Sequence, residues 1–186
     1  QKARKLLDIG VSLLLALPLR LLPKYRNVWL ICERGTDARD NGYRFFEYLR
    51  QEHPEVNAYY LADRAHRTDY ERARKAGPVV QYRSLRHKIL FVLAANLISA
   101  HNGTIEPWNY RQFQRYFGWV GRKRYIFLQH GITKDDVRHI LGKANTPFDL
   151  FITGAKPEHD YIVQHFGYAE HEAPYTGFAR FDALHD

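Results

Sequence analysis

Apolar and polar positions along this chain fall into short strand-like runs that alternate with helix-like segments. Runs rich in β-branched and aromatic residues, bounded by polar or glycine-containing segments, predict strands. These runs cover residues 28–32, 56–61, 79–82, 97–100, 125–128 and 150–153. Apolar residues at helical spacing predict helices over residues 43–52, 69–76, 85–95 and 157–166. Strands alternating with helices are typical of an α/β domain with a parallel sheet and right-handed crossovers.

The first segment has a different pattern. Residues 6–22 are mostly apolar, but Asp8, Pro18 and Arg20 interrupt them, and basic residues flank both ends. A membrane-spanning helix needs about 20 predominantly apolar residues, and a signal peptide ends in a small-residue cleavage site. The segment fits neither. It predicts an amphipathic helix that lies on an anionic membrane surface, or one that packs on its own domain or on a partner subunit.

Composition narrows the class of protein. The 186 residues are 45% hydrophobic, which suits one packed domain, and the single cysteine excludes a disulfide framework. The net charge of +8 indicates an anionic partner: nucleic acid, acidic lipid headgroups or a phosphorylated substrate. Because the chain contains no methionine, we expect it to be a fragment of a longer protein at both ends.

Polar, glycine-containing turns follow most of the predicted strands. In a parallel sheet the carboxyl ends of the strands share one edge, which is where ligands bind. We therefore expect these turns to form one cleft. The candidate binding residues at this edge are Glu33, Arg34, Asp40, Asn41, His101, Asn102, Gln129, His130 and Gly131.

His130 is the strongest candidate for chemistry. It lies between Gln129 and Gly131 at the end of a buried strand, and histidine is well suited to take a proton near neutral pH. Taken alone, the triplet fits a capping or core histidine better than a catalytic one. The other polar turns at the same edge strengthen the catalytic interpretation.

Several familiar sites are absent from the sequence. It has no GxGxxG dinucleotide motif, P-loop, CxxC, HExxH or GxSxG. The pair Asp135-Asp136 reads more simply as the first turn of a short helix than as a metal site. We therefore expect neither a metal nor a cofactor.

Basic and aromatic residues are interleaved over residues 108–124. Such a segment could stack and clamp nucleic acid, dock at a lipid interface, or form an amphipathic connection packed on the sheet.

The ordered motifs resemble one family. The turn with Asp40-Asn41, the turn with Asn102, the basic segment, the strand ending at His130 and the closing residues 176–184 appear in that order. Together they resemble the CDP-glycerol glycerophosphotransferases that make teichoic acid and capsule polymers. The resemblance runs from residue 27 to residue 184. The chain departs from the family at Ile132-Thr133 and at Ala179 and Phe181 within the closing motif.

The resemblance implies a GT-B architecture of two Rossmann-like domains. Residues 27–186 would be the amino-terminal, acceptor-side domain, preceded by a membrane-proximal amphipathic helix over residues 1–26. The donor domain, which would bind CDP-glycerol, would follow residue 186, so the fragment alone would be inactive. The expected location is the cytoplasmic face of the bacterial cell membrane, as a peripheral protein that could form a homo-oligomer.

The resemblance also implies the roles of the site residues. His130 would take the proton from a hydroxyl of a lipid-linked or polymer acceptor, which then attacks phosphorus while CMP leaves. Arg34, Arg180 and backbone N–H groups at helix starts would neutralise charge, with Asp182 a further substrate contact. Two alternatives remain open. One is a related GT-B transferase with a ribitol phosphate or sugar donor. The other is a non-catalytic basic module that binds membrane or nucleic acid; as a transferase, the protein is expected to have no nucleic acid partner.

Overall fold

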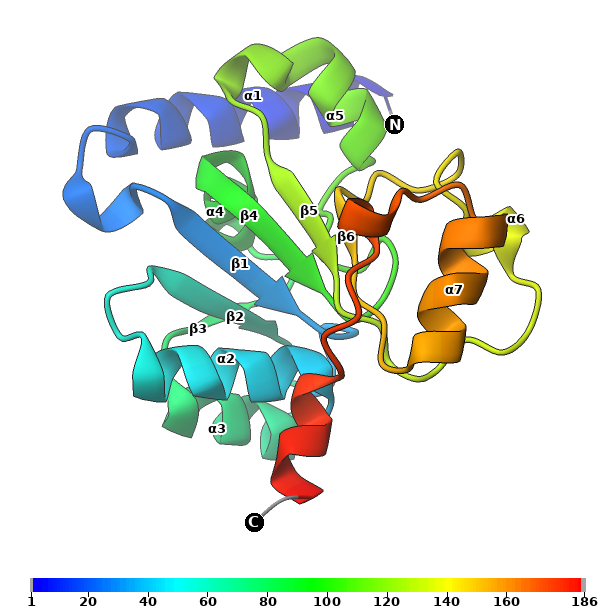
Figure 1. The fold of residues 1–186 in the computed structure, drawn as a ribbon. Coiled ribbons are helices and arrows are strands. Elements are labelled where there is room, and N and C mark those ends of the chain that lie inside the picture. The colour runs from blue at the N-terminus through cyan, green and yellow to red at the C-terminus, as the bar shows by residue number, and fades with distance from the viewer. Residues whose placement is uncertain (1, 185–186) are drawn as a thin grey trace.

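The computed structural model describes residues 2–184 and contains a six-stranded parallel sheet (Figure 1). The strands lie in the order β3-β2-β1-β4-β5-β6, so the chain reverses direction across the sheet between β1 and β4. In open α/β sheets, such a reversal opens a crevice at the carboxyl ends of the strands. The strands are β1 (Val28–Cys32), β2 (Ala58–Ala62), β3 (Val79–Gln81), β4 (Ala94–Ser99), β5 (Arg124–Phe127) and β6 (Leu150–Phe151).

Helices cover both faces of the sheet (Figure 1). The buried apolar residues form one cluster beneath α2 and α3 and a second beneath α1, α4 and α5. This three-layer arrangement confirms the predicted α/β Rossmann-like class. The helices are α1 (Lys2–Leu19), α2 (Asn41–Glu52), α3 (Arg67–Ala76), α4 (Leu85–Leu93), α5 (Tyr110–Phe117), α6 (Arg138–Leu141) and α7 (Lys156–His165), followed by the 3₁₀ helix η4 (Ala179–Leu184).

Most element boundaries differ from the sequence prediction by one to three residues, and two of these differences have a clear structural reason. Residues 94 and 95, expected in a helix, begin β4, because α4 passes into the strand without a loop. Lys123 satisfies two carbonyls at this junction: its buried Nζ donates to the carbonyls of Val92 at 2.8 Å and Ala94 at 3.0 Å. The sixth strand ends at Phe151, and Thr153 forms only an isolated bridge with Tyr175.

Helix α1 packs on its own domain through one face. Ile9, Leu13 and Ala16 recur at helical spacing and are buried in the core beside α4. Asp8 ties the helix down by accepting from Lys88 Nζ at 2.6 Å and Trp108 Nε1 at 3.0 Å. The packing alternative therefore accounts for this face of the helix.

The opposite face of α1 is apolar and exposed. Leu7 and Leu14 are more than 60% exposed, and Val11 and Leu15 on the same face are each 41% exposed. None of the helices described between residues 2 and 184 is long and apolar enough to cross a bilayer. We name Leu7, Val11, Leu14 and Leu15 the outer apolar patch.

Candidate functional site

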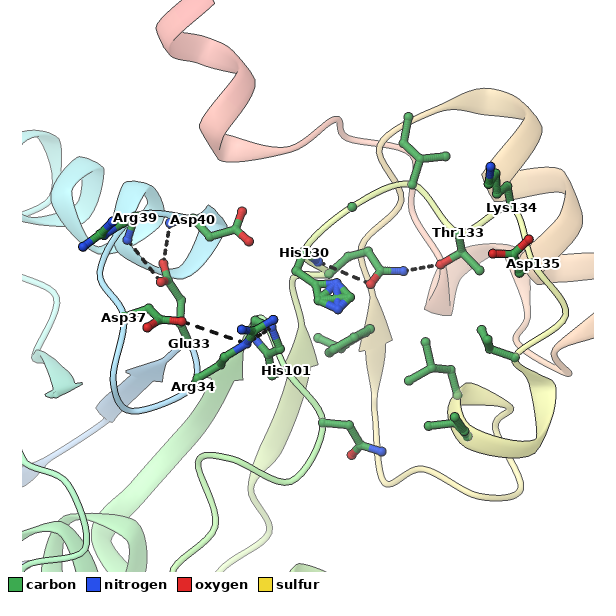
Figure 2. Close-up of a pocket in the computed structure, with 18 of the residues that line it drawn as sticks. Glu33, Arg34, Asp37, Arg39, Asp40, His101, His130, Thr133, Lys134 and Asp135 are labelled. Atoms are coloured by element: carbon green, nitrogen blue, oxygen red, sulfur yellow. Dashed lines mark hydrogen bonds and ion pairs between the residues drawn. The ribbon is translucent and has the colours of Figure 1, made fainter. Parts of the chain in front are cut away.

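A crevice of about 1000 Å³ opens at the carboxyl ends of β1, β4 and β5 (Figure 2). It lies where the chain reverses direction between β1 and β4. Most residues expected at this edge line it, so the sequence predicted the location well. Those that line it are Glu33, Arg34, Asp40, His101, Asn102, Gln129, His130 and Gly131.

A left-handed residue projects His130 out of the sheet. Gln129 has φ +62°, a strained conformation for a residue with a side chain, and such strain is concentrated at functional sites. Its side chain is buried and donates to Thr133 Oγ1, while its Oε1 accepts from His130 N at 3.3 Å. Thr133 N in turn donates to the buried carboxylate of Glu158 at 2.6 Å. These buried hydrogen bonds fix the loop that carries His130, while the His130 side chain stays exposed.

Arg180, near the end of the chain, also holds the turn that carries His130. Arg180 Nη1 donates to the carbonyl of His130 at 2.9 Å and to Asp40 Oδ1 at 2.8 Å. Buried Asn41 bridges the same parts: its Nδ2 donates to the Gln129 carbonyl at 2.8 Å, and its Oδ1 accepts from Arg180 N at 3.1 Å. Segments near residues 40, 130 and 180 therefore meet at one point. The first two were expected at this edge of the sheet, and the third was not.

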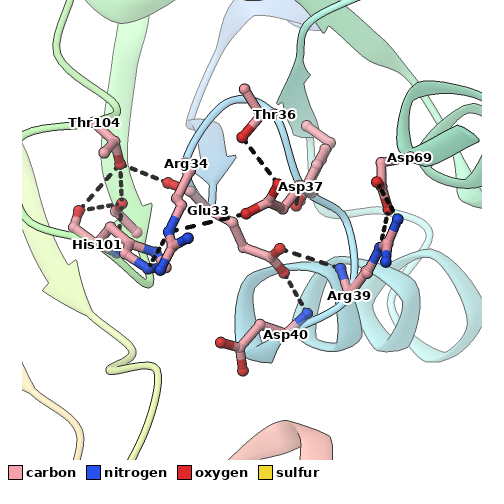
Figure 3. A network of polar contacts seen from close by, with 11 residues as sticks. Glu33, Arg34, Thr36, Asp37, Arg39, Asp40, Asp69, His101 and Thr104 are labelled. Carbon is pink, nitrogen blue, oxygen red and sulfur yellow. Dashed lines mark hydrogen bonds and ion pairs between the residues drawn. The ribbon is translucent and has the colours of Figure 1, made fainter. Parts of the chain in front are cut away.

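His101 lies directly beside His130. The two rings are 4.5 Å apart between centroids and nearly perpendicular, at 77°. Arg34 Nε donates to His101 Nε2 at 2.9 Å, so the proton of a neutral His101 resides on Nδ1. Within residues 2–184 that buried Nδ1 has no hydrogen-bond partner. The Arg34–His101 contact thus joins the turns after β1 and β4 (Figure 3), and His101 lies against the ring of His130 (Figure 2).

Both imidazoles are held neutral at neutral pH. Burial lowers the pKa of His130 below 6.5, as do the charges of Arg34 and Arg180, whereas Asp40 opposes the change. Burial, His130 and Arg34 lower the pKa of His101 to about 4. A neutral imidazole is the form that can accept a proton.

Glu33 lies at the expected edge of the sheet, but its carboxylate accepts hydrogen bonds from the backbone of the loop that follows β1 (Figure 3). Its Oε1 accepts from the backbone N–H groups of Asp40 and Tyr43, both at 2.8 Å, and its Oε2 accepts from Arg39 N at 3.1 Å. The residue is 1% exposed, and burial raises its pKa despite these three donors. Glu33 thereby shapes the turn that carries Asp40 and starts α2.

Some of the expected residues lie behind the crevice. Asn41 and Arg180 do not line it but hold its wall, as described above. Asp182 is exposed on η4, outside the crevice lining. Its predicted contact with substrate stays a prediction.

Several crevice residues were missed by the sequence analysis. Arg39, His66 and Asp69 extend the charged wall, and an apolar wall is formed by Ile132, Val137, Ile140 and Leu141. Arg39 binds Asp69 through Nε at 2.7 Å and Nη2 at 2.8 Å. The signal for Arg39 was its place between Glu33 and Asn41, in the same turn. No periodicity marks the apolar wall.

Metal ligation finds no support in the part of the chain that is described. No three or more His, Cys, Asp or Glu side chains between residues 2 and 184 gather closely enough to hold an ion. Asp136, from the acidic pair, instead accepts from Arg138 at the start of α6.

Comparison with known proteins adds a family match, one related protein and two similar structures. The family described as CDP-glycerol:poly(glycerophosphate) glycerophosphotransferase matches residues 13–186. The chain is 35% identical over 158 residues to the minor teichoic acid biosynthesis protein GgaB of Bacillus subtilis (strain 168), covering 84% of this chain and 17% of GgaB. Its fold is similar to that of a variant of the wall teichoic acid polymerase TagF soaked with CDPG, with a TM-score of 0.63 and 13% identity, covering 98% of this chain and 47% of that one. A second TagF structure gives a TM-score of 0.58 at 12% identity, covering 97% and 48%. The chain therefore spans less than half the length of each of these relatives.

Proposed function

The chain belongs to the CDP-glycerol:poly(glycerophosphate) glycerophosphotransferase family, and we propose that it is the acceptor-side domain of an enzyme that transfers glycerol phosphate from CDP-glycerol. The product would be a teichoic acid or capsule polymer. The observation that carries the proposal is His130, an exposed and neutral imidazole clamped at the carboxyl edge of a parallel sheet.

The proposed reaction is a single in-line displacement. His130 accepts the proton of an acceptor hydroxyl, and the oxygen attacks the phosphorus that bears glycerol. A new phosphodiester bond forms as the bond to CMP breaks. Phosphoryl transfer of this kind depends on positioning and charge neutralisation more than on covalent help. No covalent enzyme intermediate is formed.

The remaining site residues divide into two roles. We assign charge neutralisation to Arg34, which lines the crevice, and to Arg180, which acts from behind it; both charges are close enough to lower the pKa of His130. Substrate contact falls to His101, Asn102, Gly131, Asp40 and Asp182. Glu33, Asn41 and Gln129 position the loops, in keeping with their buried side chains and their hydrogen bonds to backbone.

We place the donor site in a second domain outside residues 27–186. This assignment is supported by the chain spanning less than half of its relatives. CDP-glycerol would then bind weakly to these residues alone, and turnover would require the complete protein. A ribitol phosphate or sugar donor remains the alternative, because donor discrimination belongs to that second domain.

The acid side of the pH profile tests the role of His130. The imidazole is a base only above its pKa, so turnover should fall as the pH drops through that value. Because burial and two arginines lower this pKa, the midpoint should lie below the 6.5 of an ordinary histidine. Asp40 opposes this shift, so Asp40→Asn, which keeps an acceptor oxygen for Arg180, should move the midpoint to still lower pH.

Turnover measured from about pH 4 to 8 on wild type and Asp40→Asn provides the comparison. An acid limb that stays in place in the variant would show that His130 does not set it.

We also propose that the protein is peripheral to the inner face of the cell membrane, bound through the outer apolar patch. Basic residues near both ends of α1 would attract anionic lipid, and the exposed leucines would enter the interface. The name of GgaB, a teichoic acid biosynthesis protein, agrees with this location. We also assign to this surface any association of the protein into homo-oligomers.

Vesicle binding should depend on both charge and the patch. Binding to anionic vesicles should exceed binding to neutral ones and weaken with salt. Leu7→Glu with Leu14→Glu should lower affinity at least about tenfold, because two exposed leucines lose apolar burial in lipid. Co-sedimentation measures this, with Tyr48→Glu, at an exposed site on α2, as the control. Equal binding to both vesicle types, insensitive to salt and to the leucine changes, would leave α1 a packing role only.

A further inference from the structure

The charged wall of the crevice continues along the start of α3. Arg34, Arg39 and His66 line the crevice, and a neighbouring hollow is lined by Arg64, Arg67, Tyr70, Glu71 and Arg74. His66, which lines the crevice, precedes α3, and Arg67, which lines the neighbouring hollow, is the first residue of that helix. We name the surface formed by Arg64, His66, Arg67 and Arg74 the α3 basic surface.

This surface carries an excess of positive charge. Residues 64–75 contain five arginine and lysine side chains against two carboxylates. Asp69 is occupied by Arg39 and by Arg72 at 3.1 Å, and Glu71 faces Arg74 at 3.6 Å.

Two of its arginines are free to bind an anion. Arg64 Nε donates to the hydroxyl of Tyr70, at 3.2 Å, and its guanidinium lies over that ring. Among the described residues, neither Arg64 nor Arg67 takes part in an ion pair within 4.0 Å, and both arginines are exposed. The hollow therefore presents these two guanidinium groups to solvent.

The spacing of charge from His130 outward fits a chain of phosphates better than a single nucleotide. Arg34 lies beside His130, and the exposed Arg64 and Arg67 lie on the α3 basic surface. Arg39 also lines the crevice but is bound to Asp69, so it marks the path without offering a free charge. A nucleotide donor has its phosphates at one place, whereas a phosphodiester polymer repeats them along its length. Guanidinium groups match phosphate oxygens in a bidentate manner.

We propose that the α3 basic surface binds the phosphodiester backbone of the acceptor polymer, whose terminal hydroxyl lies at His130. This assignment rests on the proposed function and adds the path of the acceptor: from His130 past Arg34 and Arg39 to the start of α3. A long acceptor gains interactions on this path that an acceptor with one repeat cannot reach.

The test compares acceptor lengths in the complete protein. Arg64→Glu with Arg67→Glu should raise KM for a long glycerol phosphate chain by about tenfold and leave kinetics with a single-repeat acceptor unchanged. The slope of log KM against log salt should fall by about one for each phosphate that an arginine no longer binds. The fold should survive, because an acidic residue suits the first turn of a helix.

The matched control is Arg115→Glu with Arg124→Glu. Both arginines are exposed and take part in no ion pair within 4.0 Å among the described residues; one lies in α5 and one at the amino end of β5, away from the crevice. The pair reverses the same amount of charge and should leave both KM values unchanged. Equal KM values for the long chain in the two double variants would overturn the proposal. If the proposed function itself were wrong, the result would be different: the wild-type protein would show no acceptor-dependent turnover.

Discussion

Replacing His130 by alanine should lower turnover of the complete enzyme by about 10²–10⁴-fold, the usual effect of removing a general acid–base residue. The substitution removes the neutral, exposed imidazole that is clamped at the crevice. The fold should survive. The His130 carbonyl still accepts from Arg180, and the side chain that is removed packs against the ring of His101 at the surface of the crevice.

Circular dichroism and CMP release on the same preparation separate catalysis from structure. A structural turn histidine would cost stability and leave activity per folded molecule nearly intact. His165→Ala, an exposed histidine at the end of α7, should change neither quantity and serves as the control. A folded His130→Ala variant with near-normal CMP release would end the catalytic assignment.

Replacing Glu33 by leucine should lower the free energy of unfolding by at least about 3 kcal/mol, because three backbone donors would be left without an acceptor at about 1–3 kcal/mol each. These are the N–H groups of Arg39, Asp40 and Tyr43. Leucine fills the space without admitting water to the site. Loss of the turn would also displace Asp40, so activity should fall with stability.

Glu33→Gln gives a graded comparison. Its carbonyl oxygen can still accept from Asp40 and Tyr43, as Oε1 does now, while its amide group faces Arg39 N. The loss of stability should therefore be smaller than for leucine. Denaturant unfolding measures both variants. If Glu33→Leu were as stable as wild type and showed only a raised KM, the carboxylate would bind substrate and would not hold the turn.

The sheet could be predicted from the sequence because its strands are short, buried and apolar. The run at 28–32 matches β1 at both ends, since four of its five residues are buried and the signal does not depend on tertiary contacts. The junction at residues 93 and 94 could not be predicted. Helix-forming alanines continue into β4, and two carbonyls at the junction are satisfied by Lys123, which is distant in sequence.

The position of the candidate site residues could be predicted from the sequence, but the role of each residue could not. Parallel strands bring Arg34, His101 and His130 to one edge whatever the details of packing. Which carboxylate faces a substrate and which faces the backbone depends on loop geometry: Glu33 turns inward, whereas Asp40 reaches Arg180. The left-handed conformation of Gln129 is equally invisible in the sequence, because no glycine marks it.

The configuration at phosphorus tests most directly the central claim of one in-line displacement from CDP-glycerol, while the role of His130 as its base is tested by the alanine variant above. The complete protein would be given CDP-glycerol made chiral at the glycerol-bearing phosphorus, and the configuration in the polymer would be determined. A single in-line attack predicts inversion. Retention, which requires a covalent enzyme intermediate, would contradict the account, as would a protein that transfers nothing from CDP-glycerol but turns over another nucleotide donor.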